Sequence, residues 1–307
     1  MRRAIVLAVS LIGLASCANR KPTALVVAVH SEIPVPVGIE TLELTVTSSD
    51  SRFNSKYQLY PMGDTKLPGT ITVYRPENRD SVGPVTITVT ATHAGSTVVV
   101  RKATTRFADE KQLLLRMPLR FSCAEFDGVC ADDETCKAGQ CQKATVESES
   151  LPEFEEDQVF PTAGGCFDRA KCVATGSTID VSEMFLMRPD CSFTLDELRA
   201  KAPEAAFSPT AVNVGFVWTM NTTGKWTAVD FDPEEGWQFA DAERKTLHLA
   251  PGLCEILQGR HLGPGGVPLV KKAIMNPTCP PKLPSQPECP AAAPATGSGG
   301  SGGAPAK

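Results

Sequence analysis

The sequence has few histidines and tryptophans and no run of basic residues. Its 307 residues include 4 His and 3 Trp, and the 35 acidic residues outnumber the 30 basic ones. A mildly acidic chain without a basic cluster does not attract the phosphates of nucleic acids or anionic lipid headgroups. We therefore expect no nucleic-acid partner.

Motifs of familiar enzymes are also missing. The chain has no His-Glu-x-x-His, no Walker loop and no Gly-x-Gly-x-x-Gly. Its Gly-x-Ser-x-Gly match at 299–303 lies in a Gly-rich tail, without the strand-to-helix context of a nucleophile elbow. None of the histidines, His30, His93, His248 and His261, has a second ligand or base at a local spacing. We expect no catalytic residue, no cofactor and no metal.

Long apolar runs are absent apart from residues 4–15. That run is too short to span a bilayer, which takes about 20 residues. Because Arg2 and Arg3 precede it, it has the basic start and short apolar core of an export signal. Residues 1–16 are therefore predicted to be a signal peptide.

The end of this run, Leu14-Ala15-Ser16-Cys17, resembles the lipobox of bacterial lipoproteins. The resemblance implies that Cys17 becomes the acylated first residue of the mature chain, with residues 17–22 next to the membrane. Two or more acyl chains anchor a protein stably, so it also implies permanent membrane attachment. By the sorting rule of enterobacterial lipoproteins, Ala18 in place of Asp implies the outer membrane.

The cysteine count agrees with export. Of the 11 cysteines, assigning Cys17 to lipid leaves an even number that can pair completely. Disulfides persist in oxidising compartments outside the cytoplasm. Removal of residues 1–16 also takes away two arginines and changes the formal charge from −5 to −7.

Residues 23–121 show the two-residue periodicity of strands with one buried face. Leu42, Leu44 and Val46, for example, alternate with polar residues. Seven such runs with turns between them are typical of an immunoglobulin- or fibronectin-like β-sandwich, although a Cys…Trp…Cys core is missing. The expected strands are 24–30, 39–48, 55–60, 68–75, 84–93, 96–107 and 111–117.

Four cysteines follow at even gaps within residues 122–142. Zinc motifs favour close pairs separated by a wider gap. We therefore expect a small disulfide knot rather than a zinc site. Our guess is an interleaved pairing, Cys123 with Cys136 and Cys130 with Cys141, although the sequence alone does not decide it.

Residues 143–163 are predicted to form an acidic linker. They carry six acidic side chains and no basic side chain between positions 144 and 160. Such a run repels itself and stays extended in solvent. Recognition of a basic partner is the alternative.

Residues 164–289 are the expected second domain, β-rich with some helix and stabilised by disulfides. Thr194 and Glu197 form the pattern of a capping box for a helix at 195–202. Residues 290–307, rich in Pro, Ala, Gly and Ser, are expected to be disordered. The six cysteines of this domain are expected to pair with one another in an undetermined order: Cys166, Cys172, Cys191, Cys254, Cys279 and Cys289.

All three tryptophans, Trp218, Trp226 and Trp237, lie in the second domain. A hairpin centred on Thr222 would set Trp218 opposite Trp226. An aromatic pair of this kind suits a sugar-binding platform. It also suits a domain core, and we favour the core because Trp218 continues the apolar side of its strand.

Four carboxylates follow this hairpin, Asp230, Asp232, Glu234 and Glu235. Asp230 and Asp232 would share one face of an extended strand, and paired carboxylates serve as acid and base in glycoside hydrolases. Hydrolysis of a polysaccharide is therefore the enzymatic alternative. The same stretch is also an ordinary Asp-Pro-Glu-Glu-Gly turn.

The order of these parts resembles cysteine-rich cell-surface lipoproteins common in myxobacteria. The shared features are the lipobox, the Thr-rich sandwich, the Cys-x5-Cys-x4-Cys knot and the Cys-Pro pairs at Cys279 and Cys289. The resemblance implies an architecture and no activity or site residues. Our leading hypothesis is a non-enzymatic lipoprotein, anchored by its lipid on the outer membrane or cell surface, that binds a surface protein or a glycan. An accessory subunit of an envelope assembly is a further alternative.

Overall fold

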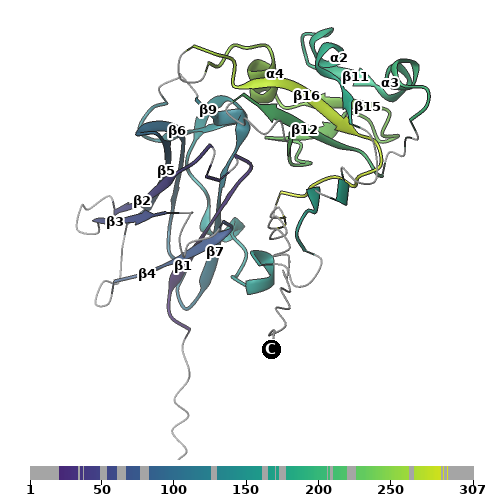
Figure 1. Cartoon of the computed structure of the whole chain (residues 1–307). Helices are drawn as coiled ribbons and strands as arrows, with labels where there is room; N and C mark the ends of the chain where they lie inside the picture. Colours follow the sequence, from purple (N-terminus) through teal and green to yellow (C-terminus); the bar gives the residue numbers. More distant parts are fainter. Residues whose placement is uncertain are drawn as a thin grey trace, which may run out of the picture.

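The computed structural model describes residues 21–289 apart from short gaps, and the fold is mainly β (Figure 1). The predicted signal peptide, the lipobox with Cys17 and the tail at 290–307 lie outside the described residues. The gaps are residues 34, 37, 49–53, 61–66, 77–82, 126–129, 161–164, 170, 173–177, 206, 208–209, 220–225, 263–265, 285 and 287–288.

The first half is a sandwich of two sheets that share one hydrophobic core. One sheet has the order β4-β1-β7, with β1 antiparallel to β4 and parallel to β7; the other has the order β3-β2-β5-β6. All seven predicted strands are present, with ends within two residues of the prediction, while immunoglobulin-like topology stays a prediction. The strands are β1 (Ala24–Ser31), β2 (Thr41–Ser48), β3 (Asn54–Leu59), β4 (Gly69–Tyr74), β5 (Val85–His93), β6 (Ser96–Thr105) and β7 (Gln112–Leu119).

The knot after the sandwich is a disulfide-bonded hairpin of β8 (Glu134–Lys137) and β9 (Gln140–Lys143). Ala138 and Gly139 at its tip both have positive φ, as a two-residue hairpin turn of this hand requires. The predicted pairing is confirmed, because Cys123 bonds Cys136 and Cys130 bonds Cys141. All four sulfurs are therefore used in disulfides and do not form a zinc site.

The acidic segment is not a free linker, so this prediction was wrong. Its backbone pairs with the sandwich: the Leu114 N–H donates to the Pro152 C=O (2.8 Å), and the Phe154 N–H donates to the Gln112 C=O (2.8 Å). Val159 is buried against Leu114 and Ala28. The acidic side chains remain exposed. Apolar residues spaced between the acids therefore attach this segment to the sheet.

The second half holds two more sheets, with orders β10-β16-β12-β13 and β11-β15-β14. Short helices pack beside them. The predicted capping box at the start of α3 is present, and α4 is tied to the rest by Cys191–Cys254. The elements are β10 (Ile179–Asp180), α2 (Ser182–Leu186), β11 (Ser192–Thr194), α3 (Leu195–Lys201), β12 (Asn213–Trp218), β13 (Trp226–Ala228), β14 (Trp237–Phe239), β15 (Thr246–Leu249), α4 (Pro251–Leu257) and β16 (Val270–Asn276).

Within the described residues, the ten cysteines form five disulfides. Cys166–Cys289 and Cys172–Cys279 join the start of the second half to its end, across sequence separations of 123 and 107 residues. Five disulfides indicate a protein that works outside the cytoplasm. Among the helices in the described ranges, none has the length and apolarity needed to cross a bilayer.

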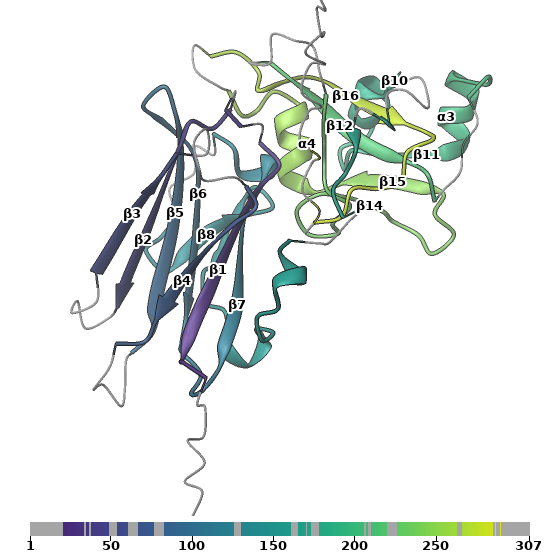
Figure 2. The same ribbon diagram turned by 60° about the horizontal axis from the view of Figure 1, so that its bottom comes forward.

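The two halves share one continuous hydrophobic core. Phe121, in the turn η1 (Phe121–Cys123) after β7, packs its ring on Phe216 and Trp218 of β12, with centroids 6.1 and 5.0 Å apart. At a second contact the Gly252 N–H donates to the Ala138 C=O at 3.0 Å. The halves therefore meet as packed surfaces, at the end of the sandwich opposite the start of β1 (Figure 2).

Candidate functional site

The proposed tryptophan platform is not formed. Trp218, Trp226 and Trp237 are only 1%, 6% and 0% exposed. The observed register pairs Trp226 with Val217 rather than with Trp218. Because a shift of one residue turns a side chain to the opposite face of a sheet, the two indole rings lie on opposite sides of β12 and β13. None of these rings offers a flat surface to a sugar.

Each tryptophan instead fills a separate part of the interior. Trp218 belongs to the main core and contacts Phe121, whereas Trp226 lies in a smaller cluster beside Phe167, with ring centroids 6.4 Å apart. Gly215 leaves room for the Trp226 ring, since an added Cβ there would overlap it. The Trp237 indole N–H donates to a backbone carbonyl at 3.2 Å. These contacts are those of a core.

The predicted carboxylate pair lies at the junction of the two halves. Asp230 is fully buried and accepts hydrogen bonds from Arg120, at the end of β7, and from Lys282, near the end of the chain. Asp232 accepts from the same guanidinium at 3.1 Å. The sequence thus brings Asp230 and Asp232 together as expected, but both are bound to a cation from the first half.

Glu32, just after β1, completes this side of the junction. It accepts from Arg120 at 3.0 Å, and its second carboxylate oxygen accepts from the Phe121 N–H at 3.1 Å. It also accepts from the backbone N–H of Asp230 at 2.9 Å. One buried carboxylate of the first half therefore fixes backbone groups of both halves.

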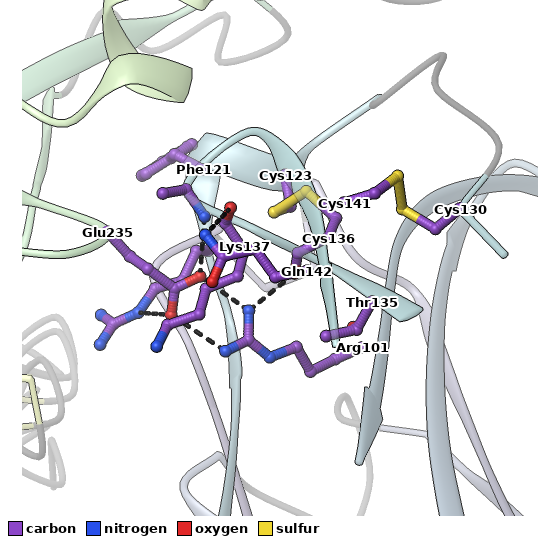
Figure 3. The surroundings of a disulfide bond; sticks show 12 residues. Arg101, Phe121, Cys123, Cys130, Thr135, Cys136, Lys137, Cys141, Gln142 and Glu235 are labelled. Atoms are coloured by element: carbon purple, nitrogen blue, oxygen red, sulfur yellow. Dashed lines mark hydrogen bonds and ion pairs between the residues drawn. A yellow bond between two sulfur atoms is a disulfide. The ribbon is translucent and has the colours of Figure 1, made fainter. Parts of the chain in front are cut away.

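Glu235 binds the knot and β6 in the same way (Figure 3). The Arg101 guanidinium donates to both of its carboxylate oxygens, at 2.7 and 3.1 Å. Arg101 also donates to the Cys136 C=O at 2.8 Å, and the Ala138 N–H donates to Glu235 at 3.2 Å. A bidentate pair of this kind is strong and directional.

We call these seven charged groups the joint cluster. It contains four carboxylates and three cations, so its charges are nearly balanced, and a buried charge is tolerated only when it is paired and hydrogen-bonded. Burial, and then the positive charges of Arg120 and Lys282, lower the pKa of neighbouring His30 well below its ordinary value. The members are Glu32, Arg101, Arg120, Asp230, Asp232, Glu235 and Lys282.

The arrangement holds the halves together rather than supporting catalysis. A glycoside hydrolase needs two carboxyl groups that flank a substrate, whereas Asp230 is 0% exposed and already accepts from two cations. Sequence reasoning missed Glu32, Arg101, Arg120 and Lys282. Glu32 and Arg120 have one local signal, a charged residue placed directly after an apolar strand, whereas Arg101 lies within β6 and Lys282 follows no strand.

Comparison of this chain with protein-family models, with curated proteins and with solved structures finds no match.

Proposed function

We propose that this protein is a lipid-anchored scaffold outside the cytoplasm, without catalytic activity, that holds its second half away from the membrane for binding to a surface protein. The observation that carries the proposal is the joint cluster, whose buried ion pairs lie between the halves and fix their relative orientation. Because these buried charges fix the two halves relative to each other, the sandwich can hold the second half in one orientation toward a partner.

Chain geometry supports this orientation. If Cys17 carries lipid, the seven residues to Ala24 reach at most about 25 Å when fully extended. The start of β1 then lies near the membrane surface, and β1 leads directly to the joint cluster at Glu32. The second half lies at the other end of the sandwich (Figure 1). The sandwich would therefore serve as the spacer that the acidic segment does not provide.

The other hypotheses fare differently. Polysaccharide hydrolysis through Asp230 and Asp232 has no support from the geometry, and a glycan ligand loses its basis with the burial of the three tryptophans. Binding of a protein partner, either alone or as an accessory subunit of an envelope assembly, keeps its support. Outer-membrane placement rests on Ala18 and is part of the proposal.

Fractionation of cells that express the wild-type chain or Cys17→Ala tests the anchor. We expect wild type in the membrane fraction with an acylated Cys17 by mass spectrometry, and we expect Cys17→Ala in the soluble fraction. Ser16→Ala is the matched control, because a small residue is kept before the cysteine, and it should stay with the membrane. Wild-type protein with an unmodified amino terminus would refute the anchor.

A further inference from the structure

The helices α2 and α3 lie at the end of the molecule farthest from the start of β1 (Figure 1), and a groove lies between them. Its volume is about 350 Å³. Met184 and Phe193 form its buried floor, while Met187 and Ala200 line its two sides. All of its lining residues belong to the described part of the chain.

The α2 side of the groove exposes large apolar side chains. Met187 is 77% exposed and Leu186, beside it, is 44% exposed. Contiguous exposed apolar residues often mark an interaction surface, whereas a single exposed apolar residue is normal on any protein. Methionine is also the side chain that best adapts its shape to a partner. The α3 side is lined by Ala200, whose small side chain is also exposed.

Four charges stand at the corners of this groove, and their signs alternate. On the α2 side Glu183 is followed by Arg188; opposite them on the α3 side are Lys201 and Glu197. The Lys201 Nζ lies 3.9 Å from the Glu183 carboxylate, and Arg188 donates to Glu197 at 2.7 Å. Going around the groove, the order is therefore negative, positive, negative, positive.

An alternating square of charges is complementary to itself. When a second copy is turned over about a two-fold axis that runs along the groove, its α3 side lies over the α2 side of the first copy. Glu183 then meets Lys201 of the second copy, and Arg188 meets Glu197. The same rotation sets the exposed Met187 over the small side chain of Ala200 on the second copy. Each copy therefore places a large apolar side chain over a small one of the other copy.

We propose that the α2/α3 groove is a self-association surface, on which a second copy of this chain docks about a two-fold axis with Met187 of each copy in the groove of the other. Such isologous contacts are the commonest form of protein dimer. A partner of uniform charge would meet a like charge at two of the four corners, which favours a second copy over a basic or an acidic partner.

Apolar contact supplies the affinity of this dimer, and the charges set its orientation. Exposed ion pairs add little to the free energy of association because solvent screens them. In this dimer each charged side chain also gives up its ion pair within the chain for one with the other copy. Like charges placed opposite each other, however, disfavour association. Changes at Met187 and changes of sign at the corners thus test separate parts of the proposal.

The first test is sedimentation velocity of the purified chain over a wide range of concentration. We expect a reversible monomer–dimer equilibrium, which Met187→Lys weakens by more than about tenfold. Leu283→Lys is the control, since Leu283 is 52% exposed and outside the groove. Circular dichroism confirms that each variant is folded. A wild-type chain that stays monomeric throughout, or a dimer that Met187→Lys leaves unchanged, would overturn the proposal.

The second test exchanges one corner charge at a time. Glu183→Lys alone and Lys201→Glu alone each set like charges opposite each other in a homodimer, so both should dimerise more weakly than wild type. In an equimolar mixture, Lys at 183 of one copy meets Glu at 201 of the other, and every corner again has opposite signs. We expect the mixture to recover dimers. A mixture that associates no better than its components rules out this geometry.

Discussion

Arg120 is the residue on which most of the charge balance of the joint cluster depends. It is 3% exposed and binds Glu32, Asp230 and Asp232, the first two of them fully or almost fully buried. A carboxylate left without its cation in such a place pays the cost of desolvation without compensation. Removal of the guanidinium therefore affects both halves at once.

We predict that Arg120→Ala lowers the free energy of unfolding by about 3–5 kcal/mol, the cost of breaking a buried ion pair by removing one partner. Urea denaturation of the oxidised protein measures the change. Arg199→Ala is the matched control: its pair with Asp196 is on the surface, so little change is expected. Equal effects of the two substitutions would contradict a structural role for the joint cluster.

Two residues, Asp230 and Trp226, show what the sequence alone did not reveal. The structural role of Asp230 was missed, and an enzymatic pair stayed open as an alternative, because its partners Arg120 and Glu32 are 110 and 198 residues away in the chain. Trp226 was misplaced by a register error of one residue, which the sequence between Trp218 and Trp226 did not decide. Both failures concern long-range or register information, which local periodicity does not contain.

Elements fixed by local rules were predicted correctly. The seven sandwich strands follow from alternation within each strand. The knot pairing was a guess that the sequence alone did not decide, and the structure confirms it. The prediction of a free linker at 143–163 was wrong because it rested on the acidic residues alone. It did not consider Leu151, Phe154 and Val159, which lie between them and pack against the sandwich. Charge decides which side chains stay in solvent, but the apolar residues decide where this backbone lies.

The capping box of α3 gives a prediction at this scale. The Glu197 N–H donates to the Thr194 hydroxyl at 3.2 Å, and the Thr194 N–H donates to the Glu197 carboxylate, which holds the pKa of that carboxyl below its ordinary value. We expect Thr194→Ala to cost about 1 kcal/mol of stability in thermal or urea unfolding. Thr194→Ser keeps the hydroxyl and should cost much less; an equal loss in both would argue against the cap.

On the scale of the whole molecule, stability depends on pH through His30, which lies beside the joint cluster. Burial is the first cause of the lowered pKa of His30, and Arg120, Lys282, Arg116 and Arg101 add their positive charges. His30 therefore stays neutral in the folded chain at pH values where the unfolded chain binds a proton. Since the unfolded state then binds more protons, stability is complete above about pH 6.5 and falls as the pH decreases below it.

We predict that each pH unit below 6.5 costs up to about 1.4 kcal/mol through this histidine, until the pH reaches its folded-state pKa. Urea denaturation at pH 7.5, 6.5 and 5.5 measures the slope, and His30→Gln should flatten it over this interval, because glutamine does not titrate. His93→Gln is the matched control for a His→Gln exchange outside the joint cluster, since His93 lies 3.5 Å from the Glu40 carboxylate. Carboxylates whose pKa is lowered, such as Asp241, lose their stabilisation only nearer pH 4, so they do not account for a loss between pH 6.5 and 5.5. A slope in this interval that persists in His30→Gln would place the sensitive group elsewhere.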